Sequence, residues 1–273
     1  MSNEIGVMAG LRAEGPSLNY VAEFGLKACQ LVCWNQKLFT AERADAIRKE
    51  SESTGVKVTS FWAGWPGPAT WNFIDGPVTL GLVPREYRKE RVEVLKKAGD
   101  FAKQAGLPAI VTHLGFIPEN PRDPVFDEVV AAVRDVAAYV KTLGLEFWFE
   151  TGQETPITLL RLIDSVGTGN LGINLDPANL ILYGKANPID ALDTFGQHVR
   201  GVHAKDGTYP TEPMNLGHEV KVGKGKVKFP QFVRRLSEIG YKGAYIIERE
   251  ISGDQQTKDI AATVKYLTKL VAE

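Results

Sequence analysis

Cysteine is nearly absent from this chain, which has only Cys29 and Cys33 among its 273 residues. Both lie inside the apolar run of residues 28–34, where a thiol packs as a small hydrophobic side chain. We therefore predict two buried free thiols in a reducing compartment, instead of a disulfide or half of a zinc site. A disulfide framework of the kind that holds small secreted domains together is excluded.

Long hydrophobic runs are also missing. No stretch of about 18 apolar residues occurs in the sequence, so no transmembrane helix is predicted. The first residues carry no basic patch that leads into an apolar stretch, as a secretory signal would. We therefore expect a cytoplasmic protein with no membrane partner.

An excess of charge of either sign is lacking as well. Lysine and arginine total 32 against 33 for aspartate and glutamate, which gives a formal net charge of −1. No long basic run is present. Because affinity for nucleic acids depends on basic side chains that neutralise phosphates, nucleic acid is not an expected partner.

The sequence does contain eight short apolar segments that alternate with eight helical segments. The predicted strands are residues 5–10, 28–34, 56–62, 109–116, 146–151, 171–176, 199–205 and 244–250. Strict alternation indicates parallel strands, and about 250 residues is the usual size of an eight-stranded α/β barrel. No glycine-rich dinucleotide fingerprint follows any strand, which favours a closed barrel over a doubly wound sheet. We predict one (β/α)8 TIM barrel domain over residues 1–273.

Capping residues predict where two helices begin. Ser17 is expected to cap a helix that runs through Phe24. Thr155 and Pro156 form a favourable cap and first-turn pair for a helix through Val166. We expect loops after the strands that end at residues 176 and 205.

Polar residues stand at the ends of the last four predicted strands. They are Glu150, Asp176, His203 and Glu248. In a barrel, the carboxyl ends of the strands converge on the face where active sites lie. A buried carboxylate is costly to desolvate unless a cation or a proton donor meets it. Three carboxylates and one imidazole suit one Mn²⁺, Mg²⁺ or Co²⁺ ion, with Zn²⁺ less favoured because it prefers more nitrogen or sulfur.

Aromatic side chains accumulate near the same face. A Gly- and Pro-rich segment after the third strand, residues 63–77, carries Trp65, Trp71 and Phe73. Trp34 and Trp62 stand at the ends of two strands. Together these rings could form a platform for the apolar face of a sugar-like ligand, or the segment could simply pack against its own scaffold.

Three polar residues are further candidates for substrate binding. His113 ends the fourth strand, although a hydrogen-bonded structural histidine is the alternative. Glu154 could accept a hydrogen bond from a substrate hydroxyl, or be a solvated loop carboxylate. Lys205 could polarise a carbonyl group, or form a plain ion pair with the adjacent Asp206.

Several motifs at these positions resemble those of the xylose isomerase-like barrels. They are Phe149-Glu150, Asn174-Leu-Asp176, Val202-His-Ala-Lys-Asp206, the Gly223-x-Gly225 turn, and Gly240-Tyr-x-Gly243 before Ile247-Glu248. This superfamily includes tagatose 3-epimerase-like enzymes, hydroxypyruvate isomerase, inosose dehydratase and endonuclease IV. The resemblance spans essentially the whole chain, and its motifs are specific for the superfamily but weak for the reaction.

The resemblance implies that one divalent metal is held by Glu150, Asp176, His203 and Glu248. It also implies that Glu150 and Glu248 exchange protons with the carbon next to a carbonyl group. A metal that polarises the carbonyl, with carboxylates working on opposite faces, would lower the barrier to an enediolate. Barrels of this group often associate through helices and loops, so we also consider a homo-oligomer.

Two positions depart from the epimerase pattern. Asn179 stands where those enzymes have a histidine that touches substrate, which makes Asn179 a candidate substrate ligand. An arginine follows the histidine of the seventh strand in the epimerases, whereas the nearest cations here are Lys205, Lys221 and Lys224. Endonuclease IV has a histidine ligand of its zinc cluster at the position of Asn179, which argues against a DNA-repair function.

The predicted site and the resemblance favour a metal-dependent isomerase or 3-epimerase of a small ketose or keto-sugar. The alternative keeps the metal and base but removes or adds water or an alcohol next to a keto group, as in inosose dehydratase or lyases of 3-keto-glycosides. A third hypothesis is a non-catalytic sugar-binding barrel, which the complete set of ligands disfavours. In each case the expected partner is a small carbohydrate.

Overall fold

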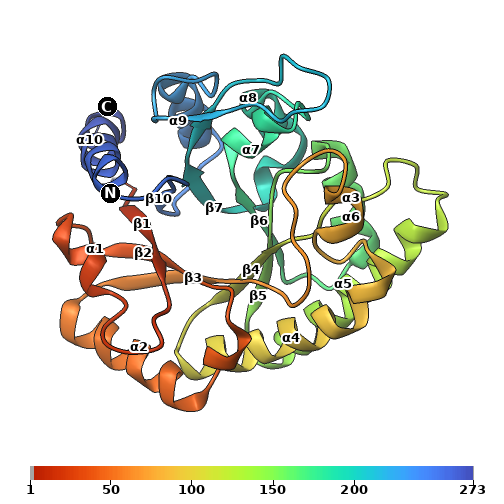
Figure 1. Cartoon of the computed structure of the whole chain (residues 1–273), viewed down its shortest axis with the longest axis horizontal. Coiled ribbons are helices and arrows are strands. Elements are labelled where there is room, and N and C mark those ends of the chain that lie inside the picture. Colours follow the sequence, from red (N-terminus) through yellow and green to blue (C-terminus); the bar gives the residue numbers. More distant parts are fainter. Residues whose placement is uncertain (1–2, 273) are drawn as a thin grey trace.

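A computed structural model describes residues 3–272, so Met1, Ser2 and Glu273 of the predicted domain lie outside the described residues. Its barrel strands are β1 (Ile5–Gly10), β2 (Ala28–Cys33), β3 (Lys57–Ala63), β4 (Ala109–His113), β5 (Glu146–Glu150), β6 (Leu171–Leu175), β7 (Val199–Ala204) and β10 (Tyr245–Ile247). They are parallel and close in the order β1-β10-β7-β6-β5-β4-β3-β2, with the helices outside them (Figure 1). The predicted TIM barrel is confirmed.

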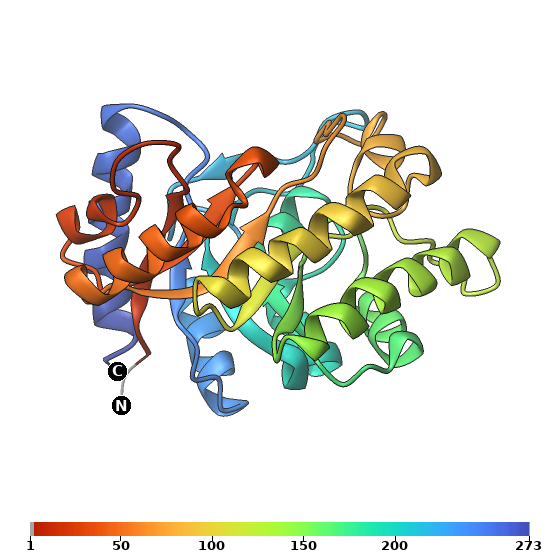
Figure 2. The ribbon, with the colours of Figure 1, turned by 90° about the horizontal axis from the view of Figure 1, so that it is seen from below.

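Helices alternate with these strands. They are α1 (Asn19–Glu23), α2 (Ala41–Thr54), α3 (Gly76–Thr79), α4 (Arg85–Gln104), α5 (Pro124–Thr142), α6 (Pro156–Val166), α7 (Pro177–Leu182), α8 (Pro188–Phe195), α9 (Phe229–Glu238) and α10 (Asp254–Leu270). In α5, buried Val129, Val133, Val136 and Val140 recur every three or four residues, so one face of the helix packs inward. Both chain ends lie at the same side of the barrel, next to α10 (Figures 1 and 2).

Side chains along each strand alternate between the barrel interior and the surrounding helices. In β5, Phe147 and Phe149 belong to the main hydrophobic core that the helices complete. The residues between and after them, Trp148 and Glu150, therefore lie on the interior side. The same alternation places an interior residue at or just past the carboxyl end of a strand, and the predicted ligands Glu150 and His203 lie within β5 and β7, while Asp176 and Glu248 directly follow β6 and β10.

The barrel interior contains a polar layer as well as apolar side chains. Gln30 of β2 donates to Asn174 Oδ1 of β6 at 3.2 Å, and these strands are not neighbours, so the bond crosses the barrel. Gly201 of β7 makes room for this amide, since a Cβ there would lie 2.5 Å from Asn174 Oδ1. The layer lies beneath the predicted metal site.

Ser17 does not cap the first helix, which corrects the prediction. α1 begins at Asn19 with Leu18 at its N-cap and no side-chain capping bond. The Ser17 hydroxyl instead accepts from Arg12 N at 3.0 Å, while the N–H groups of Ser17 and Leu18 donate to Glu50 Oε2 at 2.7 and 2.9 Å. A carboxylate from α2 thus satisfies the two backbone N–H groups that directly precede α1.

Both predicted loops contain regular elements. α7 begins directly after Asp176, whose side chain caps it by accepting from Asn179 N at 2.8 Å. The later loop holds an antiparallel pair, β8 (Asp206–Gly207) and β9 (Glu219–Val220). Asp206 accepts from the backbone N–H groups of Gly223 and Gly225 at 2.9 Å each, and a Cβ at Gly225 would lie 2.2 Å from Asp206 Oδ1. The glycine turn is therefore packed on Asp206.

Two expectations from composition can be compared with the structure. None of the helices within residues 3–272 has the length and apolar character that crossing a membrane requires. Cys29 and Cys33 are free and buried, as predicted. Burial raises the pKa of the Cys29 thiol to about 12, so this sulfur stays protonated and unreactive.

Candidate metal centre

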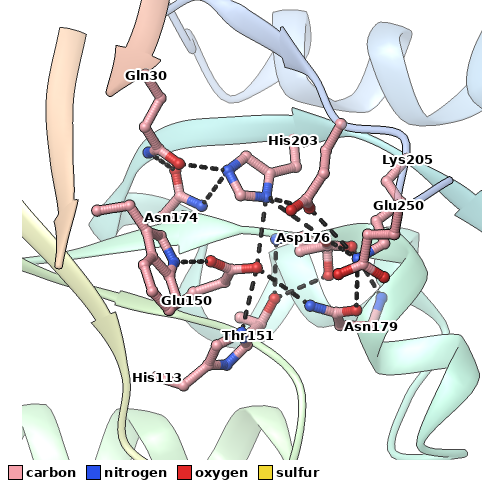
Figure 3. A network of polar contacts seen from close by, with 12 residues as sticks. Gln30, His113, Glu150, Thr151, Asn174, Asp176, Asn179, His203, Lys205 and Glu250 are labelled. Carbon is pink, nitrogen blue, oxygen red and sulfur yellow. Dashed lines mark hydrogen bonds and ion pairs between the residues drawn. The ribbon is translucent and has the colours of Figure 1, made fainter. Parts of the chain in front are cut away.

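The carboxyl ends of four strands bring one cluster of side chains together. Glu150 ends β5, Asp176 follows β6, His203 lies in β7 and Glu248 follows β10. Each offers one ligand atom, and these atoms lie within 4.8 Å of one another. His203 Nδ1 is 3.1 Å from Glu248 Oε2 and 3.4 Å from both Glu150 Oε1 and Asp176 Oδ2. The four residues predicted as metal ligands are thus adjacent in space, and Figure 3 labels Glu150, Asp176 and His203 of this cluster.

The other nitrogen of His203 is held from within the barrel. Nε2 lies 2.8 Å from Gln30 Oε1 and 3.0 Å from Asn174 Nδ2, and only the shorter contact can be a bond donated by this nitrogen. Gln30 Nε2 donates to Ser60 Oγ at 2.9 Å, which directs its carbonyl oxygen toward the ring. Neutral His203 therefore carries its proton on Nε2 and directs the Nδ1 lone pair at the carboxylates.

Charge and burial in this cluster favour a bound cation. Burial lowers the pKa of His203, but the carboxylates of Glu150 and Glu248 outweigh burial and place it well above its usual value. The positive charge that the carboxylates require can thus come either from a proton on the His203 imidazole or from a metal ion. Three carboxylate oxygens and one imidazole nitrogen fit Mn²⁺, Mg²⁺ or Co²⁺ and also accommodate Zn²⁺. The cluster could therefore hold one divalent ion.

Glu150 is fixed by the side chains around it. Trp62 Nε1 donates to Oε2, and Asn179 Nδ2 donates to Oε1 at 3.2 Å. His113 Nε2 lies 3.3 Å from the same Oε1 atom. Three residues predicted to bind substrate therefore contact the carboxylate of Glu150, a predicted metal ligand, and both of its oxygens are engaged.

Glu248 is held less completely than Glu150. Its contacts with His203 at 3.1 Å and with Lys205 at 3.3 Å both use Oε2. Its side chain is 16% exposed, against 3% for Glu150. Oε1 of Glu248 therefore takes no part in these two contacts.

A cavity of about 270 Å³ adjoins both glutamates. Trp34, Trp62, Trp71 and His113 form an aromatic wall. Leu182, Tyr183 and Leu216 also line the cavity, as do Asn179 and Glu250. The cavity thus combines polar atoms with aromatic faces, as sugar sites require.

Glu154 and Lys205, two other predicted substrate ligands, do not line this cavity. Glu154 is buried, and neither carboxylate oxygen has a hydrogen-bond partner among the described residues. Burial raises the pKa of Glu154 to about 7. The ammonium of Lys205 is also buried and pairs with Glu250 Oε2 at 2.9 Å rather than with the adjacent Asp206. Substrate contact by either residue stays a prediction.

The aromatic segment divides into a packed part and a part at the cavity. Trp65 is only 3% exposed and packs in a cluster with Trp62 and Trp148, which favours the predicted alternative that the segment packs against its own scaffold at this residue. Trp71 is 40% exposed and lines the cavity. Phe73 contacts Tyr183 edge-on, with ring centroids 6.0 Å apart. Of these aromatic side chains, Trp71 is the one positioned to meet a ligand.

Sequence reasoning missed the polar residues behind the site. Gln30 and Asn174 orient His203, and Glu250 pairs with Lys205. Each of Gln30 and Asn174 is the only polar residue in an otherwise apolar strand, and this pattern is the sign of a buried polar contact that the sequence offers. Because their partners lie across the barrel, that signal identifies a buried polar contact but not its purpose.

Solved structures extend this description. A xylose isomerase domain protein from Planctomyces limnophilus is 37% identical, covering 99% of this chain and 98% of that chain with a TM-score of 0.93. The 3-keto-D-glucoside 4-epimerase from E. coli, in its apo form, has a TM-score of 0.72 at 16% identity, covering 98% and 99% of the two chains. A xylose isomerase-like TIM barrel protein from Mycobacterium smegmatis, solved in complex with magnesium, has a TM-score of 0.71 at 17% identity, covering 98% and 96%.

Sequence comparison gives partial matches to curated relatives and a nearly complete match to one family. A Methanocaldococcus jannaschii protein of unassigned function is 27% identical over 177 residues, which are 60% of this chain and 58% of that protein. The chain thus matches only about half the length of such relatives. The family model described as xylose isomerase-like TIM barrel matches residues 18–270. The chain therefore belongs to the xylose isomerase-like TIM barrel family.

Proposed function

We propose that this protein is a divalent-metal-dependent isomerase or 3-epimerase of a small ketose or keto-sugar. The observation that carries the proposal is the pair Glu150 and Glu248, which both contact His203 Nδ1 and both line the same cavity. Two carboxylates beside one substrate-sized cavity are suited to proton abstraction and return. The fold shared with a keto-glucoside epimerase agrees with this chemistry.

The proposed metal ligands are Glu150, Asp176, His203 through Nδ1, and Glu248. A divalent ion held by them would polarise the substrate carbonyl and neutralise the charge that develops on its oxygen. Gln30 keeps the His203 proton on Nε2, and this leaves Nδ1 free to bind the metal ion. The donor set favours Mn²⁺, Mg²⁺ or Co²⁺ over Zn²⁺, and it does not select among the first three.

Glu248 is the better placed base, because its Oε1 atom takes no part in the contacts with His203 and Lys205. In the proposed reaction, Oε1 accepts the proton from the carbon next to the carbonyl. The electron pair of the broken C–H bond forms a double bond to the carbonyl carbon, and the π pair of the carbonyl moves onto its oxygen, which yields an enediolate. Glu150, held by Trp62 and Asn179, would take up a proton from solvent and deliver it to the opposite face or the neighbouring carbon, and Glu248 would release its proton to solvent.

The cavity supports a substrate about the size of one sugar ring. Its volume of about 270 Å³ falls just below the range of about 300–1,000 Å³ that is usual for drug-sized ligands. Trp34 and Trp71 present exposed ring faces at its wall, where the C–H groups of a sugar could pack. We infer a small carbohydrate substrate from this combination.

Turnover in deuterium oxide tests the proposed reaction. The Mn²⁺-loaded protein would be incubated with fructose, tagatose, psicose and 3-keto-glucosides, and the products analysed by NMR and mass spectrometry. We expect deuterium at the carbon next to the carbonyl of a converted substrate and none with Glu248→Gln. An unsaturated product would instead indicate a lyase. Complete retention of hydrogen during confirmed turnover would overturn proton abstraction and leave both glutamates as ligands only.

A further inference from the structure

We propose that Lys205 acts as a built-in cation that takes the place of a second metal ion and so limits the centre to one divalent ion. This inference rests on the metal centre proposed above. It concerns a side chain that neither lines the cavity nor belongs to the four proposed ligands. Its role follows from which oxygen atoms surround its ammonium group.

Four side-chain oxygens surround Lys205 Nζ. Glu250 Oε2 lies at 2.9 Å, Glu248 Oε2 and Asn179 Oδ1 at 3.3 Å, and Asp176 Oδ2 at 3.6 Å. The lysine is only 2% exposed, so these oxygens replace its water shell. Figure 3 shows its ammonium enclosed by the labelled side chains of Asp176, Asn179 and Glu250.

Two of these oxygens also belong to the proposed metal site. Asp176 Oδ2 and Glu248 Oε2 contact His203 Nδ1 at 3.4 and 3.1 Å as well as Lys205 Nζ. Each of these oxygen atoms is therefore shared between the proposed metal position and the ammonium group of Lys205. Carboxylates shared in this way are how two metal ions are held about 3.5–4 Å apart in two-metal centres.

The surroundings of the ammonium have the chemistry of a hard-cation site. Its neighbours are three carboxylates and one amide carbonyl, which are the oxygen donors that Mg²⁺ and Mn²⁺ prefer. The carboxylates of this region carry more negative charge than one divalent ion offsets. An ammonium covalently tied to β7 supplies a further positive charge that cannot diffuse away. Removal of that side chain would leave both the donors and the space for a second ion.

Mn²⁺ binding to the wild type and to Lys205→Ala tests the proposal directly. Calorimetry and metal analysis would give the stoichiometry, and electron paramagnetic resonance would detect a spin-coupled Mn²⁺ pair. We expect one equivalent for the wild type even in excess Mn²⁺, and two equivalents with a coupled spectrum for Lys205→Ala. Lys205→Arg, which keeps the charge, and Lys224→Ala, at an exposed lysine, should each bind one.

A double variant identifies where the second ion binds. Lys205→Ala combined with Glu250→Gln removes a donor of the second position and should return the stoichiometry to one. If the wild type and a folded Lys205→Ala protein each bind one ion, the proposed role of Lys205 is overturned, and the metal centre is not affected. A coupled pair in the wild type would overturn that role without any variant. A wild type that binds no ion would overturn the metal centre itself.

Discussion

The metal-ligand side and the aromatic side of the cavity are positioned in different ways. On the ligand side, strand ends of the barrel carry Glu150 and His203, and side chains from non-adjacent strands, Trp62 of β3 and Gln30 of β2, hold them. On the aromatic side, Arg91 of α4 donates to four backbone carbonyl oxygens between β3 and α4, those of Pro66 and Pro68 in the aromatic segment and those of Thr79 and Gly81 after it. The barrel thus fixes the chemistry, whereas one buried arginine positions the wall that faces the ligand.

Two tryptophans of the same segment, Trp65 and Trp71, differ in burial and in their position relative to the cavity. The guanidinium of Arg91 lies 5.2 Å from the centroid of Trp65, which is buried. Trp71 lies farther along the segment, is 40% exposed and lines the cavity. Substitutions on the two sides of the cavity should therefore change different quantities, and so should substitutions at these two positions.

The largest effects are expected on the ligand side. Glu248→Gln should retain most of the metal but lower kcat by about 10²- to 10⁴-fold, since a proton acceptor is lost. His203→Asn should weaken Mn²⁺ binding and regain part of its activity in excess Mn²⁺. Asp164→Asn, at an exposed carboxylate of α6, is the matched control. Equal rescue of both site variants by Mn²⁺ would remove the distinction between ligand and base.

Loss of the packed tryptophan should mainly affect stability. Trp65→Ala leaves a cavity beside Arg91 and Trp62, and we expect the free energy of unfolding to fall by about 3–5 kcal/mol. Denaturant unfolding, with Trp71→Ala as the comparison, measures this difference. Unchanged stability together with a raised KM would show that Trp65 belongs to the ligand platform after all.

Glu154 should make the stability of the protein depend on pH. Because burial raises its pKa from 4.5 to about 7, the folded chain holds this proton more tightly than the unfolded chain. The free energy of unfolding should therefore fall as pH rises through this window, by an amount that approaches about 3 kcal/mol. Glu154→Gln should lack this loss, whereas Glu86→Gln, at an exposed position, should keep it. Parallel profiles for Glu154→Gln and the wild type would contradict a protonated, buried Glu154.

The smallest effect is expected for Trp71→Ala. Removal of one exposed ring from the cavity wall should cost about 1–2 kcal/mol of substrate binding, comparable to other aromatic contacts. KM should rise, while the unfolding curve should stay close to that of the wild type. Unchanged kinetics with a good substrate would remove Trp71 from the binding surface.

The sequence was sufficient to predict the ligand side. Alternation along parallel strands places residues such as Glu150 and His203 at converging ends, and that rule needs no knowledge of tertiary contacts. It was insufficient for contacts that cross the barrel. Gln30 and Asn174 are 144 positions apart in the chain, so their bond becomes visible only when the barrel is closed.

The aromatic side was harder to predict for a similar reason. Arg91 lies in a highly charged helix, where a solvated arginine is the usual expectation, yet it is fully buried beneath the segment that it holds. One of the two roles predicted for Lys205 was an ion pair with Asp206, because the two residues are adjacent in the sequence. In the structure, Lys205 contacts Glu248 and Glu250, while Asp206 accepts backbone N–H groups. The ion-pair partner of a long side chain depends on which groups lie near it in the folded protein. Adjacency in the sequence does not show which groups these are.

A crystal of the wild-type protein grown with Mn²⁺, and measured at the manganese absorption edge, tests the central claim most directly. We predict one anomalous peak per chain, within about 2.5 Å of carboxylate oxygens of Glu150, Asp176 and Glu248 and of His203 Nδ1. Asp176→Asn crystals should show a weaker peak at the same place. A peak bound elsewhere, or none at this cluster under saturating Mn²⁺, would contradict the metal centre.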